Sequence, residues 1–110
     1  MPNSMNDQKS ADFAPGMMVR HLQNGYLGLV YDVDPIYCQS EEWFEMMPGS
    51  KPRKNSPWYH VLVDGETHTT YVAEENLELC GINERIDHPL ITSLFSAVCN
   101  NQYQMRQTLN

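Results

Sequence analysis

In this chain of 110 residues, the side chains that could best form a chemical site are histidines and an aspartate. His60 and His68 flank the turn dipeptide Asp64-Gly65, so two antiparallel strands joined there could bring the imidazoles face to face. Asp64 could then serve as the third ligand of a metal ion. The alternative is that both histidines are strand residues that hydrogen-bond the backbone. We favour this alternative, and we predict no metal and no cofactor.

The motifs of nucleophilic and phosphate chemistry are absent from the sequence. Serine, cysteine and histidine all occur, but no G-x-S-x-G elbow places a nucleophile, and no glycine-rich loop could cradle a phosphate. The adjacent acids Glu41-Glu42 and Glu74-Glu75 would diverge on a helix instead of sharing a site. We therefore predict that the protein is not an enzyme.

The cysteines and the N-terminal residues indicate the cellular compartment in which the protein is found. Cys38, Cys80 and Cys99 are odd in number and widely spaced, without the tightly spaced pairs that a structural zinc site needs. We predict reduced thiols in a cytoplasmic protein. Residues 1–12 are polar and contain no hydrophobic signal-peptide core, so we expect a disordered leader there.

The charge balance disfavours nucleic-acid binding. The chain carries 14 acidic and 7 basic residues, a net charge of -7. DNA-binding proteins normally neutralise phosphates with Lys and Arg side chains. The only basic cluster in the sequence is small, and it comprises Lys51, Arg53 and Lys54.

The aromatic residues leave two readings open. They could form a stacking platform for nucleic acid or peptide, or they could fill the core of a small domain. The residues concerned are Tyr26, Tyr31, Trp43, Trp58, Tyr59 and Tyr71. We expect the tyrosines at 31, 59 and 71 to lie mostly inside the barrel or on its inner rim. We expect Trp43 to attach a helical insert to the sheet, and the exposure of Trp58 stays open.

Five short strands are predicted from β-branched and aromatic runs between turn signals: residues 17–21, 26–33, 58–64, 67–72 and 77–79. Asn24-Gly25 predicts the hairpin between the first two runs, and Gly28 indicates a bulge or bend within the second. Residues 73–76 suit a single helical turn. Together these features predict a mostly β fold, a small SH3-like barrel of antiparallel strands closed by its last strand.

One helical insert is predicted between the second and third strands. Ser40 is a good N-cap, Glu41 and Glu42 suit the first turn, and Pro48-Gly49 ends the helix. We expect its buried face to contain Trp43, Met46 and Met47. Residues 49–57 then form a loop rich in Pro, Gly and Ser, which carries the basic cluster.

A second helix is predicted near the C-terminus. The apolar residues after His88-Pro89 have the spacing of one helical face, and they are Leu90, Ile91, Leu94, Phe95 and Val98. Residues 99–110 are polar and aperiodic, so we expect a flexible tail. The folded domain should therefore span residues 13–98.

Several sequence blocks resemble the YccV-like family, also called the hemimethylated-DNA-binding domain, which includes the HspQ-type heat-shock proteins. The blocks are Val19-Arg20-His21, Gly25-Tyr26-Leu27-Gly28, residues 31–35, residues 57–63 and residues 70–77. His88-Pro89-Leu90 with the following Phe95 is similar to the closing segment of longer members. The resemblance covers roughly residues 13–98.

The resemblance implies a non-catalytic SH3-like barrel with two possible roles. One is the binding of hemimethylated DNA. The other is that of a specificity-enhancing accessory factor for the Lon protease, acting on denatured proteins through protein contacts. It also implies self-association into a homo-oligomer such as a trimer. For the DNA role we expect the contact residues to be Lys51, Arg53, Lys54, Trp58 and Arg20.

Overall fold

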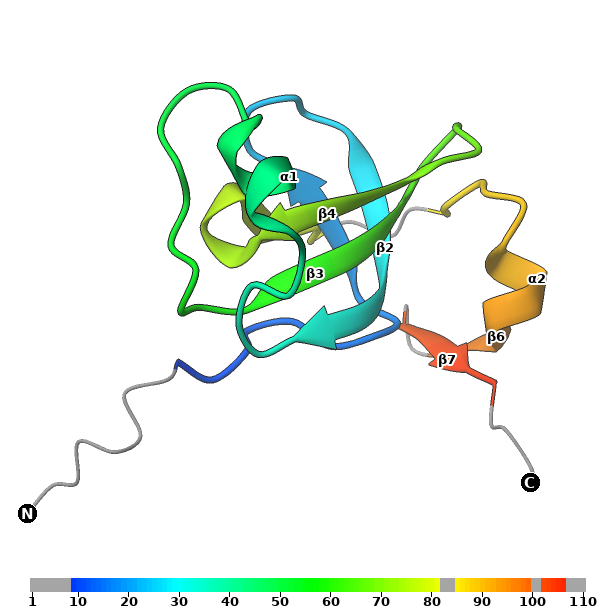
Figure 1. Ribbon diagram of the computed structural model, residues 1–110. Coiled ribbons are helices and arrows are strands. Elements are labelled where there is room, and N and C mark those ends of the chain that lie inside the picture. Colours follow the sequence, from blue (N-terminus) through cyan, green and yellow to red (C-terminus); the bar gives the residue numbers. More distant parts are fainter. Residues whose placement is uncertain (1–8, 82–84, 100–101, 107–110) are drawn as a thin grey trace, which may run out of the picture.

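The computed structural model describes residues 9–81, 85–99 and 102–106, which form seven strands in two antiparallel sheets, two short helices and one 3-10 turn (Figure 1). The large sheet contains β1 (Met18–His21), β2 (Leu27–Asp34), β3 (Trp58–Val63), β4 (Thr69–Ala73) and β5 (Leu77–Leu79). The small sheet pairs β6 (Phe95–Cys99) with β7 (Gln102–Met105). The mostly β, antiparallel fold that we predicted is confirmed.

The large sheet has the strand order β4-β3-β2-β1-β5. Val19, Val61 and Val72 come from three different strands but pack in one cluster, so the sheet curls around an interior. The 3-10 turn η2 (Glu74–Asn76) leads from β4 directly into β5, as the sequence predicted. No ladder joins β4 to β5 within the described residues, so the closed barrel that we expected is not formed and the SH3-like assignment stays a prediction.

The β1–β2 hairpin follows the predicted turn chemistry. Gly25 has a φ of 76°, and its amide donates to the carbonyl of His21. A positive φ at this position suits glycine because it has no Cβ. The turn fixes the register in which Arg20 lies opposite Leu27.

Gly28 has a different role from the predicted bulge. The bulge lies between Val30 and Asp32, at Tyr31. A Cβ on Gly28 would stand 2.3 Å from Cγ1 of Val61 and 3.0 Å from the carbonyl oxygen of Leu62. Glycine is therefore needed here because β3 approaches β2 too closely for a side chain.

Strand β3 lies at the centre of the packing because its side chains alternate between two clusters. Tyr59 and Val61 pack with Val19 and Val30 inside the curled sheet. Leu62 points the other way and packs with Phe95 of β6 and other buried side chains of the small sheet. Both sets are fully or nearly fully buried.

Helix α1 (Glu41–Glu45) begins where the sequence predicted. Ser40 adopts the extended N-cap conformation, and its side chain accepts a hydrogen bond from the Trp43 amide. The predicted buried face is wrong in part, because the buried residue of this five-residue helix is Phe44, which packs on Trp58. Met46 is 82% exposed. Figure 1 shows α1 lying over β4.

The C-terminal segment differs most from expectation. Helix α2 (Ile91–Leu94) is only one turn long, and residues that we assigned to its face form β6 instead. The predicted loose tail contains β7, which pairs with β6 through contacts such as Val98 opposite Tyr103. The amide of Tyr103 donates to the carbonyl of Gly16, and Tyr103 is buried, so the large sheet holds β7 in place.

The N-terminal segment is attached to the domain from its first described residue. Glu74 is buried, and its carboxylate accepts hydrogen bonds from the Asp12 amide and the Tyr59 hydroxyl. The Lys9 ammonium lies 2.6 Å from the same carboxylate. Residues 9–12 of the predicted leader are therefore ordered against η2, and residues 1–8 lie outside the described part of the chain.

Candidate functional site

The loop between α1 and β3 is held in place by its backbone. The amide of Tyr37 donates to the carbonyl of Lys54, and the Trp58 indole Nε1 donates to the carbonyl of Arg53. The Arg53 amide in turn donates to Oε1 of Glu75. The predicted basic cluster thus lies on a loop with a defined conformation.

Two of the three basic side chains in this loop stabilise helix α1. The Lys51 ammonium donates to the carbonyls of Glu45 and Met47, which lack intrahelical partners at the C-terminal end. The Lys54 ammonium pairs with Glu41 and lies 4.5 Å from the centroid of the Phe44 ring. Both ammonium groups therefore already have partners within the protein.

Arg53 is the cation of the loop that remains available. Its side chain is exposed and has no ion pair among the described residues. It lines a hollow of about 320 Å³ together with Lys9 and with the acids Asp12, Glu74 and Glu75. A polyanion that approaches Arg53 therefore also meets carboxylates.

Trp58 and Arg20 do not extend this basic surface as we expected. Trp58 has no exposed surface, so it cannot stack on a base, and it instead packs on α1 and fixes Arg53. Arg20 lies on β1 and its Nε atom is 3.8 Å from the carboxylate of Glu78 on the neighbouring β5. The five predicted contact residues thus reduce to Arg53, with Arg20, Lys51 and Lys54 already paired.

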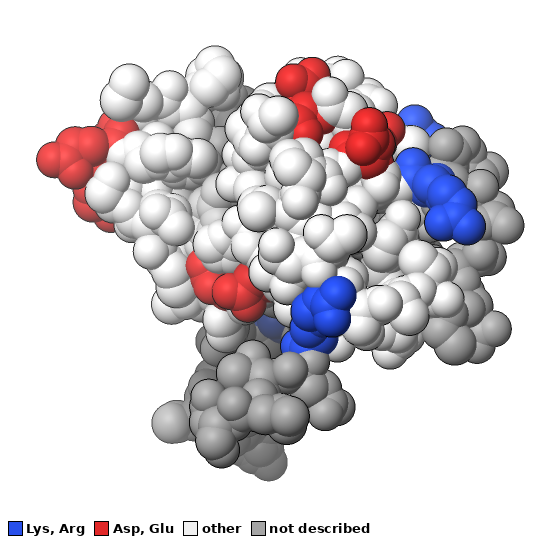
Figure 2. Space-filling model, turned by 90° about the vertical axis from the view of Figure 1, so that its right-hand side faces the viewer, with Lys and Arg blue, Asp and Glu red and all other residues white. Residues whose placement is uncertain are grey.

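Figure 2 shows the face that forms the right-hand side of Figure 1. Its Lys and Arg side chains lie apart from one another, interspersed with acidic ones over a mostly uncharged surface. No continuous basic patch is present on this face of the described structure.

A groove of about 510 Å³ runs along the outer edge of β4, between the β1–β2 turn and the α1 insert. It is lined by His21, Asn24 and Tyr26 from the turn, by Gln39, Trp43, Met47 and Pro48 from the insert, and by His60, residues 69–73 and Asn76. Three of the six candidate platform aromatics, Tyr26, Trp43 and Tyr71, therefore share one surface. Tyr59 and Trp58 are core residues.

The β1–β2 side of the groove is neutral. Nδ1 of His21 accepts hydrogen bonds from the amides of Gln23 and Asn24, and its ring stacks on Tyr26 with centroids 5.0 Å apart. Burial lowers the pKa of His21 below its ordinary value of 6.5. The Tyr26 hydroxyl and the Thr70 hydroxyl share a hydrogen bond of 2.8 Å.

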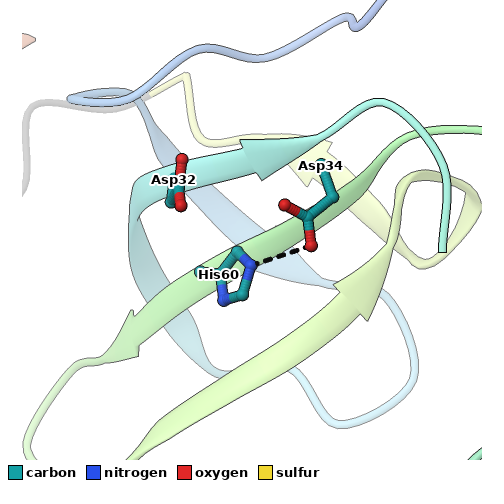
Figure 3. Close-up of side chains that lie close together, drawn as sticks. All are labelled: Asp32, Asp34 and His60. Atoms are coloured by element: carbon teal, nitrogen blue, oxygen red, sulfur yellow. Dashed lines mark hydrogen bonds and ion pairs between the residues drawn. The ribbon is translucent and has the colours of Figure 1, made fainter. Parts of the chain in front are cut away.

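An acid–histidine cluster lies beside the groove, which it reaches through the lining residue His60 (Figure 3). Asp32 and Asp34 lie on β2, and His60 lies opposite Asp32 on β3. Nε2 of His60 is 3.0 Å from Oδ2 of Asp34, which also accepts a hydrogen bond of 2.7 Å from the Tyr71 hydroxyl. Burial and the bond to this carboxylate both raise the pKa of Tyr71.

This cluster replaces the metal site that we weighed from the sequence. His60 bonds Asp34, whereas the carboxylate of Asp64 accepts from the Asp87 amide. Donor atoms of Asp32, Asp34 and His60 lie within 4.8 Å of one another, close enough to hold a cation. The hydrogen bonds already satisfy the Asp34 oxygen without one. The spacing Asp32-Val33-Asp34 was the available sequence signal, since alternate residues of a strand share a face.

Comparison with known families identifies the chain. The model described as "Hemimethylated DNA-binding protein YccV like" matches residues 11–102. The match covers most of the described structure, from the segment before β1 into β7. The chain therefore belongs to the YccV-like family, which is a family of DNA-binding domains. None of the helices in the described part is long and apolar enough to cross a membrane.

Proposed function

We propose that this protein binds DNA without catalysis and prefers hemimethylated duplexes, in the manner of HspQ-type proteins. The observation that carries the proposal is the family match over residues 11–102. The proposed contact surface is the loop that holds Lys51, Arg53 and Lys54, because the exposed Arg53 side chain on it has no ion pair in the described structure, whereas the ammonium groups of Lys51 and Lys54 bond groups of the α1 insert. A cytoplasmic location and an SH3-like barrel belong to the same proposal.

The charges limit how tightly one chain can hold a duplex. A protein that makes about 6–10 phosphate contacts loses roughly three to five orders of magnitude in affinity between about 50 and 200 mM salt. One available arginine and a few paired cations cannot supply that number. Self-association, for example as a trimer, would place several copies of the loop on one duplex, and we include a homo-oligomer in the proposal for that reason.

The proposal is tested by fluorescence-anisotropy titration of three duplexes that differ only in being hemimethylated, fully methylated or unmethylated, each at two salt concentrations. We expect the hemimethylated duplex to bind most tightly and its affinity to fall as salt rises. Equal affinity for all three duplexes would contradict methylation reading. No binding at the lower salt concentration would contradict DNA binding altogether.

A second candidate function is that of an accessory factor that enhances the specificity of Lon-type proteolysis of denatured proteins. The exposed apolar side chains offer contacts to a protein partner, since Met46 is 82%, Leu79 57% and Leu22 51% exposed. A degradation assay with purified Lon and a denatured substrate tests this role: the protein should raise the degradation rate, and an unchanged rate would exclude it.

A further inference from the structure

The groove along β4 has the form of a binding site for an extended chain. β4 is an edge of the large sheet and pairs only with β3 in the described structure. All five of its residues, Thr69–Ala73, line the groove. An edge strand offers unpaired backbone donors and acceptors, which an added extended segment can use.

Two aromatic side chains line the groove where the α1 insert meets β4: Trp43 of the insert and Tyr71 of β4. The ring centroids of Trp43 and Tyr71 are 5.6 Å apart, and their planes meet at 73°. The Tyr71 ring also lies 4.7 Å from the ring of His60. Trp43 is 39% exposed, so part of its indole surface is accessible. The accessible indole surface of Trp43 attracts a cation through its π electrons, and the Tyr71 ring beside it is stacked on Trp58 with centroids 5.2 Å apart.

The charges around the groove favour a cationic occupant. The residues that line it include neither Lys or Arg nor Asp or Glu, and one carboxylate, that of Asp34, bonds the lining residues Tyr71 and His60. The whole chain carries a net charge of -7. The same aromatic cluster already attracts one cation, because the Lys54 ammonium lies 4.5 Å from the Phe44 centroid and 5.7 Å from the Tyr37 centroid.

From these observations we infer that the β4 groove binds an extended basic segment of a partner protein. An Arg or Lys side chain of that segment lies against Trp43 and Tyr71, while its backbone follows β4. A nucleic-acid strand is the less suitable occupant, since no lining cation would neutralise its phosphates. The inference is independent of the proposed DNA function, because it uses a different surface from the loop that carries Arg53.

The test uses synthetic peptides and the full-length protein. A glycine-serine peptide that carries arginines is compared with a peptide of the same length that carries glutamates, and with a single-stranded oligothymidine. Binding is followed by tryptophan emission and by calorimetry. We expect the arginine peptide alone to bind and to change the emission of the exposed Trp43.

Matched variants locate the site. Trp43→Ala should weaken arginine-peptide binding by about tenfold, the loss of one desolvated cation–π contact, and Trp43→Phe should retain part of the affinity. Val98→Ala, at an exposed position of β6, is the control and should bind as the wild type does. Circular dichroism of each variant checks that it is folded.

Three results with the peptides would overturn the inference. They are equal binding of the glutamate peptide, absence of arginine-peptide binding, and arginine-peptide binding that a folded Trp43→Ala variant retains in full. Oligothymidine binding that Trp43→Ala abolishes would also overturn it and would assign the groove to nucleic acid. If Trp43→Ala loses arginine-peptide binding but still binds the DNA duplex, the groove is not needed for the proposed DNA function, and the two proposals can be judged separately.

Discussion

At the level of single residues, the three cations of the loop between α1 and β3 have different roles. Lys51 donates to the last carbonyls of α1 and Lys54 pairs with Glu41, so both hold the helix. Arg53 is held only through its backbone, by Trp58 and Glu75, and its guanidinium faces solvent. Substitutions at these positions should therefore have separable effects on stability and on DNA binding.

Arg53→Ala should weaken binding to all duplexes and reduce the slope of log affinity against log salt by about 1, because one phosphate contact is lost. Its melting temperature should match that of the wild type. Lys51→Ala is the matched variant: it should lower stability by about 1 kcal/mol, since helix carbonyls lose their donor. Anisotropy and thermal melts distinguish the two. Unchanged DNA affinity in Arg53→Ala would remove this residue from the interface.

His21 makes the stability of the domain depend on pH. Burial lowers its pKa in the folded state below 6.5, so the unfolded chain binds the proton more readily. The free energy of unfolding should therefore decrease as pH falls below about 6.5 and recover above it. Protonation would also remove the Nδ1 lone pair that accepts from the Gln23 and Asn24 amides.

Urea unfolding at several pH values measures this dependence. His21→Asn is the matched variant, because its side-chain oxygen can accept nearby backbone amides but does not titrate. We expect a smaller loss of stability at acid pH in the variant than in the wild type. An identical pH profile in both would assign the dependence to other groups.

At the scale of elements, the small sheet is attached to the large one at Gly16. Its φ is 97°, its amide donates to the Val30 carbonyl, and its carbonyl accepts from the Tyr103 amide. A Cβ on Gly16 would lie 2.0 Å from the carbonyl oxygen of Tyr103. One glycine therefore links β7 to the strand at the centre of the large sheet.

Gly16→Ala should separate the β6–β7 hairpin from the large sheet while leaving that sheet folded. Hydrogen exchange should show faster exchange of amides in β6 and β7 than in the wild type, and β3 should stay protected. Gly81→Ala is the control, since nothing lies within 4 Å of the Cβ that it would add. Unchanged protection of β6 and β7 in Gly16→Ala would show that this contact does not hold the hairpin.

Elements with local signals could be predicted from the sequence, and those that depend on distant contacts could not. Asn24-Gly25 and the Ser40 cap act within a few residues, so the first hairpin and α1 begin where expected. The apolar spacing of Leu90–Val98 suits a helix, but Phe95 instead packs against Tyr103 of the next strand and against Leu62, which is far away in sequence. Short apolar runs are ambiguous between helix and strand for this reason.

In the candidate site, too, the residue types could be predicted from the sequence, but their packing and pairing could not. The sequence predicts the basic cluster and names Trp43, Tyr26 and Tyr71 among the candidate aromatics, because composition alone reveals them. It does not predict that the Trp58 side chain is buried, since that depends on where α1 packs. The pairing of His60 with Asp34 was likewise missed, because the bulge at Tyr31 sets that register.

At the scale of the whole molecule, the protein must bind its partners with a net charge of -7. An acidic protein repels a duplex except where cations are concentrated, and it attracts basic segments of proteins. The two kinds of surface lie in different places. Arg53 lies on the loop between α1 and β3, whereas the groove along β4 is lined by no Lys or Arg. We therefore assign DNA binding to the loop and the binding of a basic protein segment to the groove.

The measurement that tests this assignment most directly is NMR mapping of backbone amides during titration with a hemimethylated duplex. We expect shifts concentrated in residues 49–57, with little change at Trp43 and along Thr69–Ala73. A separate titration with the arginine peptide, in the absence of DNA because the peptide would bind the phosphates of a duplex, should shift the β4 amides and leave residues 49–57 unchanged. Duplex-induced shifts confined to the β4 groove, or no shifts at all, would rule out this assignment.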